Sequence, residues 1–303
     1  MPAVSVFASA PAAASGSASG ATAAFTLATW NVNSLKVRLP HLLAWLNTRP
    51  VDIVCLQETK LTDDKFPAQV LLEAGYRSHF AGQKTYNGVA ILVRSQRLGD
   101  SRVVATGLPE LDDPQRRLLA VTVDGMCIVC AYFPNGQSVG SEKYAYKLQW
   151  MHALTGWLRG QIGAHPRLAL LGDFNIAPED RDVHDPALWA GQILCSDAER
   201  AAFGALLALG LQDAFRRFAQ PERSFTWWDY RELAFRRKLG LRIDHILLTP
   251  ALAGACTACQ IDVELRRLER PSDHAPVVAT FGAPAAPAAA PLTEPADSAA
   301  ARA

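Results

Sequence analysis

Leu168-Ala169-Leu170-Leu171-Gly172-Asp173-Phe174-Asn175 carries the strongest structural signal in this chain. Its first four residues are apolar, which is typical of a strand that is buried on both faces. The run stops at Gly172-Asp173, so a carboxylate and then the Asn175 amide follow directly after a buried strand. Polar groups at strand ends lie on the rim of a sheet, where binding and catalytic sites are usually built. This segment therefore predicts both a sheet and a site at its edge.

Short apolar runs of the same kind lie on both sides of this segment, with a few helical patterns between them. The turn Asp124-Gly125 separates apolar runs at residues 118–123 and 127–132, which predicts a β-hairpin. Regular alternation of strands and helices is absent, and no repeat period is visible. We therefore expect two packed sheets flanked by helices. The other predicted strands are residues 25–30, 53–56, 89–93, 243–248 and 277–281, and the predicted helices are residues 41–46, 143–159 and 198–209.

The chain has 303 residues, of which 50% are hydrophobic, and a formal net charge of +1. We expect one domain over residues 25–281, because no internal segment has the composition of a linker. Residues 1–24 are rich in Ala and Ser and residues 282–303 in Ala and Pro, which predicts two disordered tails. The first tail lacks the basic start of a secretory signal and is too short and polar to span a membrane. We therefore expect a cytoplasmic protein without membrane contact.

The six cysteines include two Cys-x-x-Cys pairs, Cys127 with Cys130 and Cys256 with Cys259. Such spacing can indicate a zinc site or a redox centre. The first pair lies in an apolar, strand-like run, where residues three apart point to opposite faces and cannot bind one ion together. The second pair leads into a similar stretch. We therefore expect buried, reduced thiols, which fit a reducing cytosol.

Polar residues stand at the ends of several predicted strands, as Asp173 does. Each of them alone is equally typical of a turn or a cap, because Asp and Asn bond to their own backbone. Taken as a set, they contain every group that hydrolysis of a phosphodiester requires. These residues are Asn31, Asn33, Glu58, Tyr132, Asp173, Asn175, Asp244, Asp273 and His274.

Hydrolysis of a phosphodiester requires a hard cation, a base that activates water, and donors that hold the charge developing on the phosphate oxygens. Glu58 and the amide of Asn31 offer the oxygen ligands that Mg²⁺ or Mn²⁺ prefers. Asp173 is the candidate base that orients and deprotonates the water. Asn175, two residues later, is a candidate to hold the water or the phosphate.

Tyr132 and His274 are the candidate donors to the phosphate oxygens. We expect Asp244 to pair with His274, because a neighbouring carboxylate fixes the tautomer of an imidazole and favours its charged form. A structure in which the two side chains lie far apart would remove this pairing.

At this point the sequence resembles a known group of enzymes, the endonuclease/exonuclease/phosphatase superfamily. Thr29-Trp30-Asn31-Val32-Asn33 and Leu56-Gln57-Glu58-Thr59-Lys60 are similar to its opening motifs. Leu171-Gly172-Asp173-Phe174-Asn175 resembles its central signature, and Ser272-Asp273-His274-Ala275-Pro276-Val277 resembles its closing motif. Each motif is moderately specific, but all of them in this order leave little room for chance.

Narrower features resemble the exonuclease III branch of that superfamily, which includes abasic-site endonucleases. They are Tyr86-Asn87-Gly88-Val89-Ala90, Gln115-Arg116-Arg117, and Tyr132-Phe133-Pro134-Asn135-Gly136. The most telling is Phe225-Thr226-Trp227-Trp228-Asp229-Tyr230, followed by Gly240-Leu241-Arg242-Ile243-Asp244. In that branch, this last stretch forms an apolar slot for a flipped-out sugar that lacks its base.

The resemblance implies an α+β fold, a four-layer sandwich in which two mostly antiparallel sheets pack face to face between helices. It implies a metal-dependent DNA phosphodiesterase of base-excision repair, which cuts 5′ to abasic sites and trims 3′ ends as an exonuclease and 3′-phosphatase. The implied metal ligands are Asn31, Glu58 and Asp273, with Asp173, Asn175 and His274 at a second position. The slot residues would be Trp227, Leu241 and Ile243, and further DNA-contacting residues would be Asn33, Lys60 and Arg116.

The expected partner is double-stranded DNA with abasic sites or damaged 3′ ends. We expect a monomer near the nucleoid that uses Mg²⁺ or Mn²⁺ and no nucleotide cofactor. One alternative is a phosphatase of the same superfamily that acts on a phosphate ester outside nucleic acids, which would not need the slot residues. Another alternative is a catalytically silent DNA-binding relative, which would lack Glu58, Asp173 or His274. All three residues are present.

A basic loop, Arg236-Arg237-Lys238, follows the Trp227 segment and is a candidate for contact with the DNA backbone. The overall charge near zero neither requires nor excludes such a partner, because DNA enzymes often concentrate positive charge on one face. Residues 180–199 are shorter than in the bacterial enzymes of the branch, and they contain Arg181 and Trp189 as further candidate DNA contacts.

Overall fold

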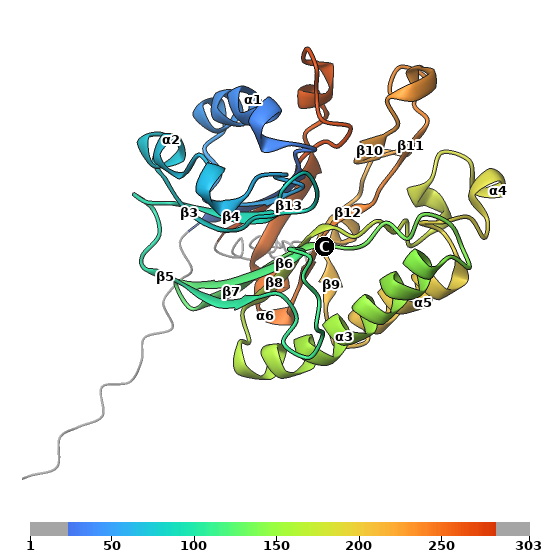
Figure 1. Ribbon diagram of the computed structural model, residues 1–303, viewed down its shortest axis with the longest axis horizontal. Coiled ribbons are helices and arrows are strands. Elements are labelled where there is room, and N and C mark those ends of the chain that lie inside the picture. Colours follow the sequence, from blue (N-terminus) through green and yellow to red (C-terminus); the bar gives the residue numbers. More distant parts are fainter. Residues whose placement is uncertain (1–23, 283–303) are drawn as a thin grey trace, which may run out of the picture.

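The computed structural model describes residues 24–282, which form two six-stranded sheets between helices (Figure 1). The strands are β1 (Phe25–Asn31), β2 (Ile53–Gln57), β3 (Tyr76–Ala81), β4 (Val89–Arg94), β5 (Ser101–Thr106), β6 (Leu118–Val123), β7 (Met126–Tyr132), β8 (Leu168–Asp173), β9 (Gln212–Asp213), β10 (Trp227–Trp228), β11 (Gly240–Leu241), β12 (Asp244–Leu248), β13 (Cys256–Ile261) and β14 (Val277–Phe281). The α-helices are α1 (Leu35–Thr48), α2 (Ala68–Glu73), α3 (Glu142–Ala164), α4 (Pro186–Trp189), α5 (Asp197–Leu207) and α6 (Pro250–Ala255). Single 3₁₀ turns are η1 (Asp63–Lys65), η2 (Asp180–Asp182), η3 (Phe215–Arg217), η4 (Arg231–Leu233) and η5 (Val263–Arg267).

The two large sheets are mixed but mostly antiparallel. Their strand orders are β13-β14-β1-β2-β4-β3 and β5-β6-β7-β8-β12-β9, and β10 pairs with β11 in a separate two-stranded ribbon. Within each large sheet, one pair is parallel, β1 with β2 and β7 with β8, and the other pairs are antiparallel. The predicted four-layer α+β sandwich is confirmed.

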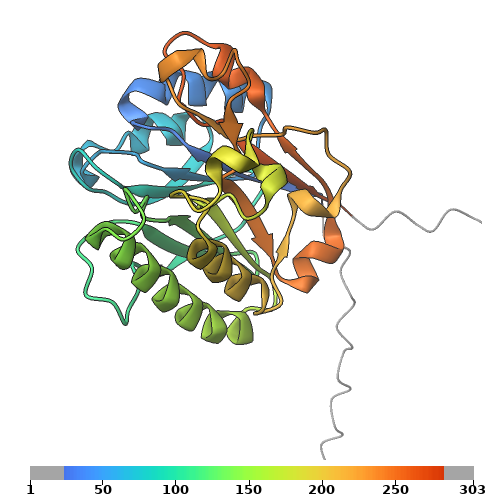
Figure 2. The same ribbon diagram turned by 90° about the vertical axis from the view of Figure 1, so that its right-hand side faces the viewer.

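Three apolar layers hold the sandwich together, and alternation along the strands assigns each residue to one of them. In β1, Leu27 faces the other sheet, whereas Ala28 and Trp30 face α1 and α2. In β8, Leu171 faces the first sheet and Leu170 faces α3 and α5. The helices cover the outer faces of the two sheets, as the two views show (Figures 1 and 2).

The register of the strands brings their polar ends to the same edge. Asp173 lies opposite Tyr132 on β7 and opposite Asp244 on β12. Asn31 lies opposite Gln57, so Glu58 follows directly beside it. Gly172 allows the close approach of β7 and β8, because a Cβ at this position would lie 1.8 Å from the carbonyl oxygen of Ala131. The Gly-Asp pair is thus required by the packing of the strands as well as by the site.

The predicted elements are present, and the main differences lie at their ends and at the sheet edges. The helix predicted to start after Pro40 begins at Leu35 and continues through the proline, a residue that usually interrupts helices. The predicted hairpin is confirmed, with left-handed φ angles of 47° at Asp124 and 70° at Gly125. Strands β3 and β5 were not predicted, because edge strands lack the continuous apolar runs of buried ones.

All six cysteines are buried free thiols, as predicted. Cys127 packs toward α3, whereas Cys130 packs between the sheets, so the two side chains point to opposite faces of β7. None of the helices within residues 24–282 is long and apolar enough to cross a membrane. The two predicted tails lie outside the described residues.

Candidate active site

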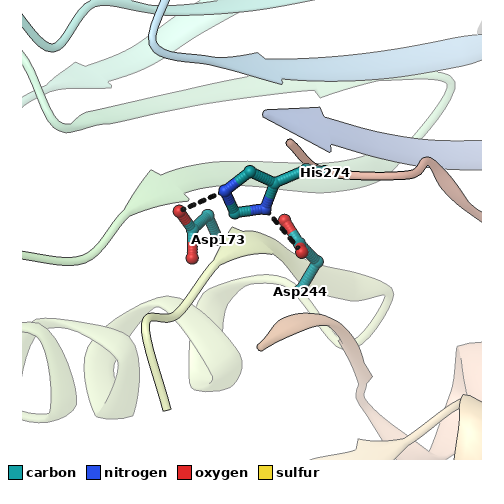
Figure 3. Close-up of side chains that lie close together, drawn as sticks. All are labelled: Asp173, Asp244 and His274. Carbon is teal, nitrogen blue, oxygen red and sulfur yellow. Dashed lines mark hydrogen bonds and ion pairs between the residues drawn. The ribbon is translucent and has the colours of Figure 1, made fainter. Parts of the chain in front are cut away.

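Three ionisable side chains from different strand ends meet at the rim of the second sheet (Figure 3). His274 lies between two carboxylates: its Nδ1 is 2.9 Å from Asp244 Oδ2, and its Nε2 is 3.8 Å from Asp173 Oδ2. Among residues 24–282, only these three offer a group of His, Cys, Asp or Glu ligand atoms close enough to hold one ion, all within 4.8 Å of one another. The predicted pairing of Asp244 with His274 is confirmed.

The two carboxylates give the site a charged imidazole. Burial alone lowers the pKa of His274, but Asp244 and Asp173 outweigh it and raise that pKa to about 10. Burial is also the largest influence on Asp173, and together with Asp244 it raises the pKa of that carboxyl to about 7, against the opposing effect of His274. At neutral pH, the site therefore contains a cation beside a carboxyl that exchanges its proton readily.

Asp173 is held by amides on both sides. Its Oδ1 accepts the backbone N–H of Asn175 at 2.9 Å, and its Oδ2 accepts the Asn31 amide at 2.9 Å. The Asn31 amide also donates to Glu58 Oε1 at 2.8 Å, so one side chain bridges the ends of both sheets. By contrast, Asp244 Oδ1 has no hydrogen-bond partner among the described residues. A buried acceptor without a partner indicates room for a ligand or a proton at this place.

Glu58 lies on a backbone segment with unusual geometry. The φ angles of Asn33, Glu58 and Lys60 are 42°, 52° and 56°, in the left-handed region that non-glycine residues rarely adopt. Such conformations cluster at functional sites because the surrounding structure must hold them. Lys60 Nζ lies 2.8 Å from Glu58 Oε2 and also donates to Asn33 Oδ1. Lys60 thus pairs with the candidate metal ligand.

Asp273 lies on the other side of Asn33. Its Oδ1 accepts the Asn33 side-chain amide at 2.9 Å, and its Oδ2 accepts the indole N–H of Trp227 at 3.0 Å. Lys60 and Asn33 thus link Glu58 to Asp273, and the two carboxylates are the kind of oxygen ligand that a hard divalent cation prefers. Asn31 turns its NH₂ group toward Glu58 and bonds the Asn33 backbone N–H through Oδ1, so in this arrangement it orients Glu58.

Tyr132 extends the site along β7. Burial, with Glu58 and Asp173 nearby, raises the pKa of the Tyr132 hydroxyl well above its usual value. The Arg117 guanidinium lies 4.8 Å from the centre of the Tyr132 ring. Tyr132 is therefore a neutral hydrogen-bond donor at any physiological pH, as a donor to phosphate must be.

Asn135 is a site residue that the sequence indicates only as part of a longer motif. Its side-chain amide donates to Asn175 Oδ1 at 3.1 Å. Asn175 in turn donates through Nδ2 to Asp173 Oδ2 at 3.3 Å and to the Phe133 carbonyl at 3.1 Å. Asn135 follows shortly after the end of β7, the strand that pairs with the Gly-Asp motif, and this position in the sequence indicates a site residue.

The three predicted slot residues form one apolar cluster next to these polar groups. Leu241 and Ile243 are buried, and the half-buried Trp227 packs against them together with Trp189. Trp227 also forms an isolated backbone bridge with His274. The predicted DNA-contacting residues Asn33, Lys60 and Arg116 are not part of this cluster: the first two lie beside Glu58, and Arg116 is exposed on the segment before β6.

Comparisons with known proteins agree with this geometry. The model described as the Endonuclease/Exonuclease/phosphatase family matches residues 28–274. Exodeoxyribonuclease III of Haemophilus influenzae is 32% identical over 265 residues, which cover 83% of this chain and 98% of that protein. A solved structure of a 3′ phosphatase from Neisseria, bound to a product DNA hairpin, is 51% identical with a TM-score of 0.81, over 85% of this chain and 99% of that one.

An AP endonuclease from Archaeoglobus fulgidus is 38% identical, with a TM-score of 0.80 over 85% of this chain and 99% of that one. The matched region contains every residue of the site described above. The family depends on a divalent metal, and the Asp173, Asp244 and His274 cluster with the adjacent Glu58 and Asp273 fits that requirement. The chain is therefore a hydrolytic DNA repair nuclease, and it belongs to the endonuclease/exonuclease/phosphatase family.

Proposed function

We propose that this protein cuts the backbone of double-stranded DNA on the 5′ side of abasic sites and removes nucleotides and blocking groups from 3′ ends. The observation that carries this proposal is the direct connection between the cutting groups and the apolar cluster. Trp227 donates to Asp273 and bridges to the backbone of His274 while its ring packs on Leu241 and Ile243. A sugar without its base leaves the helix at low unstacking cost, and Trp227 is the member of the cluster that it would contact, because Leu241 and Ile243 are buried.

Asp173 acts as the base in this proposal. A general base works best when its pKa lies near the operating pH, and that of Asp173 is raised to about 7. The backbone N–H of Asn175 and the Asn31 amide fix the two carboxylate oxygens, so the attacking water is oriented by a rigid acceptor. The Asn175 side chain is placed to hold the water or a phosphate oxygen.

His274 and Tyr132 act as donors to the phosphate. The imidazolium of His274 remains charged at neutral pH because Asp244 and Asp173 outweigh the effect of burial, so it can stabilise the negative charge that develops on the phosphate oxygens. Tyr132 stays protonated because burial and the nearby carboxylates raise its pKa, so it is a second donor in this proposal.

A Mg²⁺ or Mn²⁺ ion would be held by Glu58 and Asp273, with Asn31 orienting Glu58, and it would neutralise the phosphate and the leaving oxygen. Asp173, Asn175 and His274 would border a second position. Because Lys60 is paired with Glu58, it would have to release that carboxylate in part when the cation binds. We also propose that the protein is a monomer and that it works in the cytoplasm next to the nucleoid, where its substrate lies.

A second candidate is an enzyme that works only at 3′ ends. It is favoured by the higher identity to the Neisseria structures, whose names describe a 3′ phosphatase and a 3′-5′ exonuclease, both 51% identical to this chain. The AP endonuclease from Archaeoglobus fulgidus is 38% identical. Identity alone does not separate the two activities, because both use the same cutting groups.

A comparison of three duplexes tests the proposal. One contains a single abasic site, one ends in a 3′ phosphate, and one is intact; each is incubated with Mg²⁺ or with EDTA. We expect metal-dependent cutting of the first two, and a loss of about 10³-fold for Asp173→Asn. Activity on the 3′ phosphate alone would establish the second candidate. Activity only on an inositol phosphate or another simple ester would remove DNA as the substrate.

The basic loop supplies a further contact in this proposal. Arg236 and Lys238 are exposed on the loop that joins β10 to β11, and they line a cavity with Arg223 and Arg267. Neutralising Arg236 and Lys238 together should weaken binding to all DNA sequences alike. The slope of log affinity against log salt should become shallower by about one for each phosphate that the loop no longer neutralises. An unchanged slope in fluorescence anisotropy titrations would show that the loop does not touch the backbone.

A further inference from the structure

A fully buried ion pair lies behind the site and has no part in the chemistry described so far. Lys147 on α3 and Glu199 on α5 have no exposed side-chain surface, and Lys147 Nζ donates to Glu199 Oε1. The two helices lie side by side on the outer face of the second sheet (Figures 1 and 2). A buried pair is rarely a source of stability, because removing both charges from water costs about as much as their attraction returns. Its presence therefore points to another role.

The other two bonds of Lys147 lead to the site. Its Nζ donates to the carbonyl oxygen of Asn175 at 2.7 Å and to that of Asn135 at 3.2 Å. With Glu199, this uses all three donors of the ammonium group. These two residues carry the amides that are bonded to each other beside Asp173. One ammonium group therefore fixes the backbone beneath both amides.

Asn175 needs such an anchor because its backbone is strained. Its φ angle is 51°, in the left-handed region, where a residue with a side chain is held only by its surroundings. The bond from Lys147 to the Asn175 carbonyl fixes this conformation from behind, while the Asn175 N–H is bonded to Asp173 Oδ1 in front. The direction of the Asn175 side chain depends on both.

The same ion pair also reaches the apolar cluster. Glu199 Oε1 accepts the backbone N–H of Leu194 at 3.1 Å, and Leu194 packs with Leu241 and Ile243. Glu199 Oε2 accepts the backbone N–H of Ser196 at 3.1 Å and completes the capping box of α5. The pair thus joins the polar site and the slot to the same two helices.

We propose that Lys147 is a positioning residue, which sets the Asn135–Asn175 amide pair against Asp173 by holding the two carbonyl groups. The proposal rests on the proposed DNA-cutting function of that site. Lys147 does not touch the substrate, so its loss should lower the rate of the cutting step and leave the binding of DNA nearly unchanged. Misplacement of a catalytic group by about 1 Å can reduce a rate by about 10²-fold.

The test separates the charge pair from the two carbonyl bonds. Lys147→Met leaves the Glu199 carboxylate buried without its partner, so we expect lower stability and a lower rate. The double variant K147M/E199Q has no buried charge, so we expect much of the stability to return. Its rate should stay at least about tenfold below wild type, with KM within about twofold, because the carbonyl groups of Asn135 and Asn175 remain unanchored.

Glu199→Gln is the matched control. It removes one charge of the pair but leaves Lys147 and an acceptor oxygen in place, so the carbonyl bonds persist. We expect reduced thermal stability and a cutting rate per folded molecule close to that of wild type. Single-turnover cleavage of the abasic duplex gives the rate, and circular dichroism melting gives the stability.

Two outcomes would overturn the proposal. One is a wild-type cutting rate in K147M/E199Q, which would make Lys147 a purely structural residue. The other is an equal loss of rate in Glu199→Gln, which would assign the effect to the charge pair as a whole. The side-chain amide NMR signals of Asn135 and Asn175 give a readout without substrate, and they should shift in K147M/E199Q but not in Glu199→Gln. If wild type cuts no DNA, the proposed function fails, while these signals still test the positioning.

Discussion

Two buried histidines lie on opposite faces of the second sheet, and their pKa values are shifted in opposite directions. His274 contacts Asp244 at the start of β12, and His245 is the next residue along that strand, pointing to the other face. Burial disfavours the charged form of both. Nevertheless, the pKa of His274 is raised to about 10, whereas that of His245 is lowered to about 4.

The neighbours of each ring explain the difference. His274 lies between two carboxylates, as described above. His245 accepts a hydrogen bond from Arg242 at Nδ1, 2.9 Å away, and donates from Nε2 to the Ile176 carbonyl at 2.9 Å. Because Arg242 already carries the positive charge, a second one on His245 is unfavourable, and Asp213 at 4.0 Å compensates only in part.

The carboxylates of the two clusters also differ in their hydrogen bonding. Arg242 donates to both oxygens of Asp182, from Nε at 2.6 Å and from Nη2 at 3.2 Å, and from Nη1 to Asp213 at 2.8 Å. In the His274 cluster, Asp244 Oδ1 is left without a partner among the described residues. Burial of charge alone therefore does not distinguish a site from a scaffold in this molecule. Among the buried carboxylates of the two clusters, only Asp244 keeps an oxygen without a hydrogen bond to the described residues, which leaves it free to bind a ligand.

The largest effect is expected from two separate variants, in which either His274 or His245 is replaced by glutamine. Equal cutting rates in the two variants would contradict the comparison of the two histidines. His274→Gln removes the cation that holds the phosphate charge, so we expect single-turnover cleavage of an abasic duplex to fall by about 10³-fold. His245→Gln should leave the rate per folded molecule within about twofold, because its ring is turned away from the site. Equal losses in both variants would mean that the two clusters act as one unit.

The residues of the His274 cluster can be predicted from sequence because each follows or precedes an apolar run and belongs to a recognisable motif. Asp173, Asp244 and His274 all meet these two conditions. The Arg242 cluster was not predicted, although Arg242 lies inside one of the motifs. Its partners Asp182 and Asp213 lie 60 and 29 residues away, on a 3₁₀ turn and a two-residue strand without any periodic signal.

The same limit applies to Lys147 and Asn33. Lys147 sits in a predicted helix, but nothing in the sequence shows that its ammonium group is buried, since lysines of helices are usually exposed. Asn33 remains a predicted DNA contact, but its bonds to Asp273 and Lys60 are not indicated by any sequence pattern. Sequence patterns give the direction of a strand and the chemistry at its end, whereas contacts between distant loops depend on the tertiary structure.

Replacement of Arg242 by methionine should lower the free energy of unfolding, which would mark the Arg242 cluster as structural. It leaves the buried Asp213 without its arginine and leaves Asp182 with Arg216 alone, and breaking a buried pair in this way typically costs about 3–5 kcal/mol. The matched control is Arg267→Met, which removes an exposed arginine that pairs with Glu264 on the surface. This change should lower the free energy of unfolding by less than about 1 kcal/mol. Urea unfolding gives both values, and equal losses would contradict the assignment of Arg242 as a structural charge.

A smaller effect is expected in the pH dependence of stability, to which the buried His245 makes a contribution that can be isolated. In the unfolded chain His245 takes up its proton near pH 6.5, whereas in the folded protein it does so only at about pH 4. Between these values the unfolded state binds more protons, so the His245 contribution to the free energy of unfolding falls as the pH is lowered. The full loss is roughly 3 kcal/mol, reached below about pH 4.

The variant His245→Gln isolates this contribution. Asp173, with its pKa raised to about 7, contributes with the opposite sign over part of the same range, and His274 stays charged throughout it in the folded protein. The difference in unfolding free energy between wild type and His245→Gln, measured in urea from pH 7 to pH 5, removes both. Wild type should lose its advantage steadily as the pH falls, whereas His152→Gln on the exposed face of α3 should run parallel to wild type. A constant difference would mean that His245 has the same pKa in the folded and the unfolded protein, so that Asp213 fully offsets the effects of burial and Arg242 at its ring.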